Sequence, residues 1–153
     1  MGVIDGIFHV NGEGLPHLVM KAGGSAHPAT QETVANREHF VYQEGRAVYK
    51  HAVTDMLTSS QDVMKRNNLT VDDIDWFVPH QANLRIIEAV GDRLGINPDK
   101  VLVNIQYRGN TSAASIPLCL DENKDKLKKG DKIVLTAFGA GFTWGAMYIV
   151  WDI

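Results

Sequence analysis

The sequence holds a single cysteine, Cys119, among its 153 residues. An internal disulfide is therefore excluded, and the chain fits a reducing compartment. The sequence also lacks any run of about 18 apolar residues, and it lacks a basic and then apolar signal pattern at its start. These absences argue against a membrane protein or a secreted one, and they predict a cytoplasmic location.

Positive charge is scarce as well. Lysine and arginine together number 15, against 18 aspartate and glutamate residues, which gives a formal net charge of −3. Proteins that bind nucleic acid through its phosphates usually carry an excess of positive charge, so this class of function is not expected. The histidines other than His80 show no spacing typical of metal ligands. Neither a metal nor a cofactor is predicted.

The composition is that of an ordinary globular protein, 44% hydrophobic and 22% charged, in a chain long enough to bury a core. The chain opens directly in a strand-like stretch, residues 3–10, which favours a piece of a longer protein over a native edge strand. A second strand is predicted at residues 17–21, and the small and polar residues 22–36 are expected to form a loop.

Helical spacing dominates the next segment. Apolar residues that include Phe40 and Val41 recur at helical intervals, which predicts helix over residues 37–67. The segment is expected to form one helix, or two helices with a break near Gly45 or residues 58–60.

Strands and helices alternate in the remainder of the chain. Amphipathic spacing closed by Gly95 predicts a helix over residues 83–94, with Leu84 among its inward residues. Another helix is expected over residues 111–127, interrupted near Pro117. Short strands are expected at residues 75–79, 101–104, 132–138 and 144–151. This alternation predicts an α/β fold, a mixed sheet covered by helices.

A histidine follows the predicted strand 75–79, in the segment Val78-Pro79-His80-Gln81-Ala82-Asn83. Ligands of open α/β sheets bind at the carboxyl ends of strands. An imidazole there can donate a hydrogen bond, accept one or move a proton near neutral pH. His80 is therefore a candidate for chemistry, with a helix-capping or buried structural histidine as the alternative.

Asn110 stands in a similar setting. The segment Arg108-Gly109-Asn110-Thr111-Ser112 again joins a predicted strand to a helix through a glycine. The small residues that follow let another backbone approach closely. The amide NH₂ of Asn110 could point at a ligand oxygen, although a helix cap is the simpler explanation for this residue taken alone.

Two further features bear on chemistry. The loop Phe138-Gly139-Ala140-Gly141 can present backbone N–H groups to an anion, but it is neither a Walker loop nor a dinucleotide-binding turn. Cys119 lies between two leucines on a predicted helix and is interpreted as a small buried residue rather than a nucleophile. A hydrolase that uses Ser112 or Cys119 with His80 is disfavoured, because the sequence has no GxSxG elbow.

Three strings, VPHQANLRII, GNTSAASIP and AFGAGFTWG, closely resemble in order and spacing the C-terminal half of β-ketoacyl-acyl-carrier-protein synthase III. The resemblance is dense from Asp75 to Ile153, looser over residues 37–69 and thin before them. It implies the C-terminal half of a thiolase-like fold that lacks its N-terminal half. Residues 1–36 would then lie at the boundary with the missing half, and residues 37–153 would form the C-terminal domain. The resemblance also implies a decarboxylative condensation of an acyl-CoA primer with malonyl-acyl-carrier protein, which starts fatty-acid synthesis.

The family uses a Cys-His-Asn triad. The resemblance assigns His80 and Asn110 to stabilisation of the enolate that forms from the malonyl group, while no residue of this chain matches the cysteine. It assigns stabilisation of a second oxyanion to the backbone N–H of Ala140. The family usually has glycine at that position, so the alanine requires a backbone angle that tolerates a Cβ.

Other assignments follow from the same resemblance. Asn83 would lie near the triad, and Arg85 would dock the acidic carrier protein. Phe138 would line the pocket near the nucleophile, and Gly45 would lie in the wall of the pantetheine tunnel. The implied partners are acyl-CoA, malonyl-acyl-carrier protein, the N-terminal half of the same enzyme and a second copy in a homodimer. The alternative for the chain alone is a non-catalytic fragment that binds CoA or carrier protein, or that dimerises.

Overall fold

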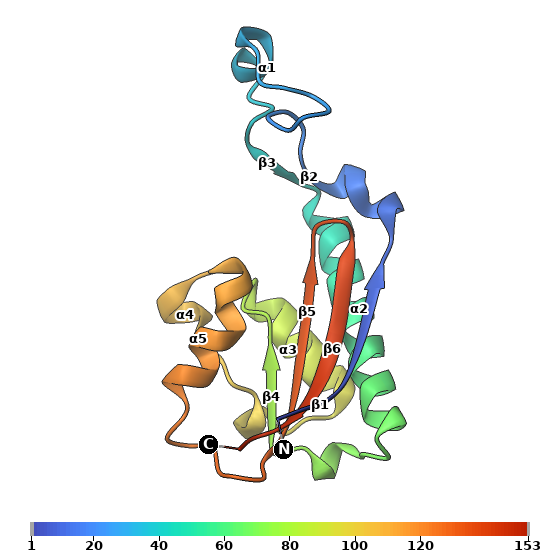
Figure 1. Ribbon diagram of the computed structural model, residues 1–153, viewed down its shortest axis with the longest axis vertical. Helices are drawn as coiled ribbons and strands as arrows, with labels where there is room; N and C mark the ends of the chain where they lie inside the picture. Colours follow the sequence, from blue (N-terminus) through green and yellow to red (C-terminus); the bar gives the residue numbers. More distant parts are fainter. Residues whose placement is uncertain (1, 153) are drawn as a thin grey trace.

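A four-stranded mixed sheet forms the centre of the structure, a computed structural model that describes residues 2–152 (Figure 1). Its strands lie in the order β1 (Gly2–Val10), β6 (Thr143–Val150), β5 (Lys132–Gly139) and β4 (Trp76–Pro79). β6 is antiparallel to β1 and to β5, whereas β4 is parallel to β5. β1, β4 and β5 therefore end at the same edge of the sheet, here called the carboxyl edge. The predicted mixed sheet is confirmed.

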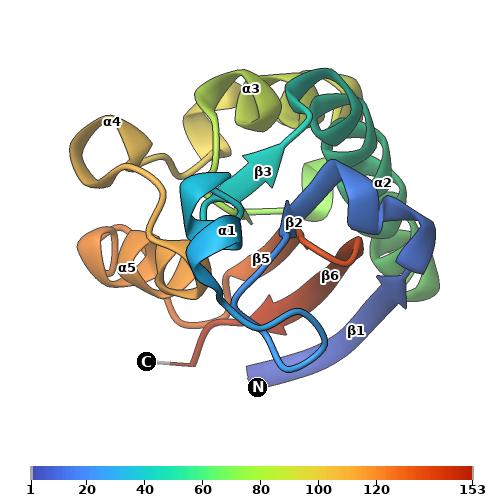
Figure 2. The same ribbon diagram turned by 90° about the horizontal axis from the view of Figure 1, so that it is seen from above.

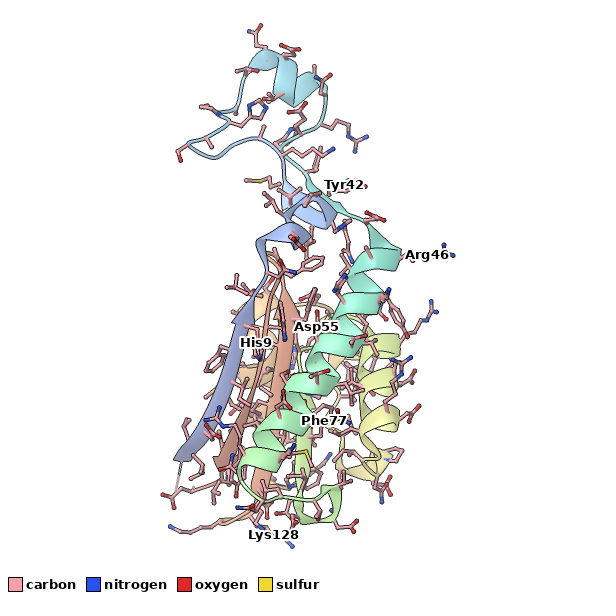
Figure 3. All side chains as sticks on the ribbon, turned by 90° about the vertical axis from the view of Figure 1, so that its right-hand side faces the viewer. His9, Tyr42, Arg46, Asp55, Phe77 and Lys128 are labelled. Atoms are coloured by element: carbon pink, nitrogen blue, oxygen red, sulfur yellow. The ribbon has the colours of Figure 1, made fainter. Side chains whose placement is uncertain are left out.

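Two helices, α2 (Gly45–Arg66) and α3 (Leu84–Leu94), lie side by side on one face of this sheet (Figure 3). Each helix has a stripe of buried apolar residues at intervals of three or four, which a helix can turn towards a single neighbouring surface. α3 ends at Gly95, whose backbone adopts the left-handed conformation at φ 81°. The main core between helices and sheet includes Val53, Met56, Ile74, Phe77, Val90 and Val134.

A shorter helix, α5 (Ser115–Glu122), covers the opposite face of the sheet on the side of β4 (Figure 2). Cys119 of α5 lies in a second, smaller core together with Val78 of β4 and Ile133 of β5. Helices thus cover both faces of the sheet near β4, which gives this part of the chain three layers.

The part of that face formed by β1 and β6 is open. Ile7 packs into the main core under α2, and side chains alternate between the two faces along a strand. Phe8 and Val10 therefore point to the opposite face, where they are 70% and 73% exposed. Met147 of β6 shares this surface, since its neighbours Ala146 and Tyr148 face the main core; the surface is called the open face. It is apolar and has no covering element among residues 2–152.

An arm formed by residues 11–44 rises from the carboxyl edge (Figure 1). Its elements are η1 (Gly12–His17), β2 (Leu18–Met20), α1 (Gln31–Ala35) and β3 (Val41–Gln43), with β2 and β3 paired in an antiparallel ribbon. Two backbone bonds anchor its base, because Asn11 N donates to Phe142 O over 2.8 Å and Phe142 N donates to Asn11 O over 2.6 Å. The Phe142 ring lies against Gly14, where a Cβ would overlap it.

Short helical turns complete the chain. They are η2 (Val71–Asp73), η3 (Pro98–Lys100), α4 (Ile105–Arg108) and η4 (Ser112–Ala114). In the part of the chain that the structure describes, no helix combines the length and the apolar character needed to span a membrane.

The segment before α2 differs from its prediction. Residues 22–36 contain the helix α1 as well as loop, and α2 is one unbroken helix that begins only at Gly45. Phe40 and Val41 are not helical core residues, because Val41 pairs with Met20 in the arm and both Phe40 and Val41 are more than half exposed. Helical spacing is a local signal, so it missed a strand that depends on pairing with residues some twenty positions earlier.

Three details near the site also differ. The strand predicted at residues 101–104 is reduced to a single bridge between Val101 and Phe77. Leu84 is 43% exposed, because it is the first residue of α3 and helical side chains lean towards the N-terminus. Pro117 does not interrupt α5, since it stands in the first turn, where backbone N–H groups have no helical partner. The division of the chain at residue 36 stays a prediction, although β1 pairs with β6 along its length.

The central position of Phe77 predicts a large effect of truncation. Phe77→Ala should lower the free energy of unfolding by about 3–5 kcal/mol, since it removes a ring with no exposed surface from the main core. Tyr107→Ala is the matched control, because Tyr107 is 83% exposed and its loss should change stability by less than about 0.5 kcal/mol. Urea denaturation monitored by circular dichroism measures both, and equal effects would contradict this packing.

Candidate active site at the carboxyl edge

A large hollow, with a volume of about 1590 Å³, lies along the carboxyl edge of the sheet and continues onto the open face. Its walls come from the starts of α2 and α3, from η4 and α5, and from the hairpin between β5 and β6. All the residues singled out by the sequence as site candidates border it: Gly45, His80, Asn83, Arg85, Asn110, Phe138 and Ala140. The fold therefore brings residues from four separate parts of the sequence around one space.

His80 stands directly after the last residue of β4. Its backbone N–H donates to Thr136 O over 2.8 Å, which continues the pairing with β5 for one more residue. The imidazole Nδ1 lies 2.6 Å from Ser115 Oγ, at the start of α5. Burial lowers the pKa of the His80 imidazole, since it disfavours the charged form. At neutral pH the ring is therefore uncharged and has one nitrogen, Nε2, outside this hydrogen bond.

Gln81 is a residue that the sequence interpretation missed. It is fully buried, and its Nε2 donates to Pro79 O over 2.8 Å and to Leu102 O over 3.2 Å. Its Oε1 accepts from the backbone N–H groups of Asn104 and Ile105, at 3.0 and 3.3 Å. This one amide joins the end of β4 to the chain that leads to Asn110, and it also explains why residues 101–104 do not continue as a strand.

A second tie holds the same chain against α5. Asn104 Nδ2 donates to Glu122 Oε2 over 2.9 Å, and Arg108 pairs with the other carboxylate oxygen. The hydrogen bond from Asn104 and then the pairing with Arg108 lower the pKa of the Glu122 carboxyl, because both favour its charged form. Gln81 and Glu122 therefore both hold the turn before Asn110 in place.

Asn110 follows a short helix, α4, and not the strand that was predicted before it. Gly109 makes the connection with φ 65° and ψ −161°, a conformation that other residues rarely adopt. The Asn110 side-chain oxygen accepts from Ser112 N over 2.8 Å. Its oxygen therefore serves as a local turn cap, while the NH₂ group of the same amide makes no hydrogen bond within residues 2–152 and belongs to a residue that borders the hollow.

The hairpin between β5 and β6 carries the glycine loop. Gly141 has φ 144°, and a Cβ there would lie 2.9 Å from Thr143 N, so glycine is required at this position. The φ angle of Ala140 is not positive, so its backbone accommodates the Cβ that an alanine has and a glycine lacks. Among residues 2–152 no acceptor engages the Ala140 N–H. Phe138 is buried, with its ring centroid 4.8 Å from that of Phe142.

The remaining candidates lie at the rim of the hollow. Asn83 caps α3, with its Oδ1 accepting from Arg85 N over 2.9 Å. The Arg85 guanidinium lies 5.6 Å from the centroid of the Tyr49 ring, and its charge is solvent-exposed. Gly45 is the first residue of α2, with open space where a Cβ would stand. Its neighbour Arg46 points away from the sheet (Figure 3).

Cys119 lies away from this hollow. Its side chain is fully buried in the second core, and burial, followed by the nearby Glu122 carboxylate, raises the pKa of the thiol to about 11. The thiol is therefore protonated at neutral pH, which agrees with its interpretation as a small buried residue. In the part of the chain that the structure describes, no three histidine, cysteine or acidic side chains are grouped to hold a metal ion.

Comparison with solved structures agrees with this geometry. The structure superposes with a TM-score of 0.86 on 3-oxoacyl-(acyl carrier protein) synthase III from Pseudomonas aeruginosa, at 34% identity, covering 99% of this chain and 46% of that one. The synthase III from Thermus thermophilus gives a TM-score of 0.83 at 38% identity, covering 96% of this chain and 45% of the other. The fold is accordingly the C-terminal half of a thiolase-like condensing enzyme.

Comparison of the sequence with known families and proteins identifies the family. The family described as 3-oxoacyl-[acyl-carrier-protein] synthase III C terminal matches residues 64–151. The chain is 63% identical over 151 residues to a beta-ketoacyl-[acyl-carrier-protein] synthase III of Porphyromonas gingivalis, and 57% identical over 151 residues to one of Bacteroides thetaiotaomicron. Both matches cover 99% of this chain but only 45% of the relative's length. The chain belongs to the synthase III C-terminal family.

The environment of Cys119 predicts low reactivity. At pH 8 the native chain should remain unlabelled by a maleimide, because a thiol with a pKa of about 11 that is also buried presents almost no accessible thiolate. The chain unfolded in guanidinium should incorporate one label, as measured by mass spectrometry. Equal labelling rates in the native and unfolded chain would contradict the burial of this thiol.

Proposed function

We propose that the chain is the C-terminal catalytic half of a β-ketoacyl-acyl-carrier-protein synthase III. Completed by an N-terminal half, it would take the acyl group of an acyl-CoA primer onto a cysteine, release free CoA, and condense that acyl group with malonyl-acyl-carrier protein with loss of CO₂. One observation carries the proposal. His80 and Asn110 border one hollow, and each has one polar atom already engaged within the chain, His80 Nδ1 and Asn110 Oδ1. Each therefore retains a single nitrogen, Nε2 or Nδ2, for a ligand in that hollow.

The chemistry needs two such donors at one point. When a malonyl thioester loses CO₂, the electron pair of the broken carbon–carbon bond enters an enolate, and negative charge builds on the thioester oxygen. A His80 Nε2–H and an Asn110 Nδ2–H aimed at that oxygen would each stabilise the transition state by about 3 kcal/mol. The partial burial of His80 supports this role, since fixed donors act more strongly where water is excluded.

The second half of the reaction uses the glycine loop. The enolate carbon attacks the acyl thioester carbon, and the tetrahedral oxyanion formed there is proposed to accept from the Ala140 N–H. Collapse of that intermediate expels a cysteine thiolate and leaves the β-ketoacyl product. The free Ala140 N–H and its unstrained backbone support this assignment. Phe138 would form the apolar wall beside the acyl group.

The nucleophilic cysteine is proposed to come from the N-terminal half. Cys119 is unsuited to the role, because it is buried away from the hollow and its thiol stays protonated. The open face supports a missing half, since an apolar surface that includes Phe8 and Val10 is normally covered in a folded protein. We propose that the N-terminal half covers it, and that the complete enzyme is a cytoplasmic homodimer.

Substrate delivery is assigned to the rim. Arg85 is exposed and would dock the acidic carrier protein, and Gly45 would leave room for the pantetheine arm. Asn83 would support the triad from the start of α3, where its side chain already fixes the helix. The second candidate function is a non-catalytic fragment that binds CoA or carrier protein, or that dimerises. The lack of any accessible cysteine within this chain favours it for the chain alone.

Complementation with a relative separates the two functions. The chain should be co-expressed with the part of the Porphyromonas gingivalis synthase that lies outside the matched 45%, and the complex purified through a tag on that part. The wild-type complex should become acylated by an acyl-CoA and should release CO₂ from malonyl-acyl-carrier protein. His80→Ala and Asn110→Ala should each lower CO₂ release by about 100-fold while leaving acylation intact.

Matched controls guard against general damage. His27→Ala and Asn97→Ala remove the same chemical groups away from the hollow, and both should leave CO₂ release within about twofold of wild type. The assigned roles are wrong if the His80 and Asn110 variants still decarboxylate normally in an acylated complex. A folded complex that binds carrier protein but performs neither step would favour the non-catalytic function.

A further inference from the structure

We propose that Ser115 is a positioning residue that holds His80 in the tautomer with its proton on Nε2. The importance of this tautomer for catalysis rests on the proposed function, since the Nε2 proton is the one the enolate needs. The claim that Ser115 fixes the tautomer rests on hydrogen-bond geometry. Ser115 opens α5, is 2% exposed, and was not singled out by the sequence.

The placement of the hydroxyl is the first step. Ser115 Oγ lies 2.6 Å from His80 Nδ1 and 3.3 Å from Gln81 N. Among residues 2–152 these are the two hydrogen bonds that this oxygen makes. The hydroxyl therefore has two hydrogen-bond partners. One of them, His80 Nδ1, can either carry a proton or lack one.

A count of protons decides between those states. The Gln81 backbone N–H can only donate, so Ser115 Oγ accepts there, and the hydroxyl proton needs a different acceptor. If His80 Nδ1 carried a proton, the oxygen would accept twice and its own proton would be buried without a partner. Such a group disfavours the folded state by a factor of roughly ten or more. If the hydroxyl donates to an unprotonated Nδ1, every group is satisfied and the ring proton lies on Nε2.

Gln81 makes this arrangement stiff. The backbone N–H that reaches Ser115 belongs to a residue whose side chain bonds to four backbone groups on both sides of the site. The oxygen of Ser115 therefore cannot rotate freely towards another acceptor without losing the Gln81 bond. Burial of His80 acts in the same direction, because it keeps the ring neutral and so leaves one nitrogen free to accept.

The tautomer can be read directly by nuclear magnetic resonance. In the chain labelled with ¹⁵N-histidine, His80 should show the shift pattern of an Nε2–H tautomer at neutral pH, with the signal assigned by its loss in His80→Gln. Ser115→Ala should convert a measurable fraction to the Nδ1–H form. Ser115→Thr keeps the hydroxyl and should restore the wild-type pattern. Ser59→Ala is the matched control, because that buried hydroxyl bonds only within α2.

The kinetic readout is a split between two constants. In the complemented enzyme, Ser115→Ala should lower kcat for CO₂ release by about tenfold and leave KM within about twofold, since binding is unchanged but a donor is misplaced in part of the molecules. Ser115→Thr should recover most of kcat. If the wild-type complex releases no CO₂, the proposed function fails, whereas the tautomer measurement still decides this inference.

Two results would overturn the role of Ser115. One is a wild-type His80 with its proton on Nδ1. The other is a Ser115→Ala variant, folded by the dispersion of its amide spectrum, whose His80 tautomer is the same as in the wild type. A variant that unfolds leaves the wild-type tautomer and the Ser115→Thr comparison to decide.

Discussion

A buried amide at the end of β4 sets the geometry on which the site depends. Gln81 has no exposed surface, so its donor and acceptor atoms must find partners within the protein. It meets this requirement by bonding to the backbone on both sides of the carboxyl edge, from Pro79 to Ile105. The residues at either end of this tie, His80 and the turn before Asn110, are therefore held in a fixed relation although thirty residues separate them in sequence.

The same hydrogen bonds explain why the backbone on either side of Asn110 adopts unusual conformations. Gly109 and Ser112 both have positive φ, and they flank Asn110 closely. A serine in the left-handed region is disfavoured by itself, but the bond from Ser112 N to the Asn110 side chain compensates for part of that cost. Such backbone conformations persist where surrounding contacts over-determine them, which here are the bonds around Gln81 and Glu122.

Much of the fold and of the candidate site was predictable, because its signals are local. A strand ended by Pro79, a helix closed by Gly95 and a glycine loop before the last strand each follow from neighbouring residues, and His80 stands out in such a setting. Asn110 follows a helical turn and not the predicted strand, and the roles of Asn110 and Ala140 were implied by the family resemblance. Pairing between distant segments was not predictable in this way. Helical spacing predicts a helix at Val41, which instead pairs with Met20, and Gln81 and Ser115 carry no pattern that marks them as buried partners.

The central claim is that two fixed donors meet one substrate oxygen. The most direct test is a crystal structure of the complemented enzyme with a malonyl thioester analogue that cannot lose CO₂. His80 Nε2 and Asn110 Nδ2 should both lie about 2.7–3.2 Å from the thioester oxygen. A bound analogue whose thioester oxygen is contacted by neither nitrogen, or by only one of them, would contradict the claim.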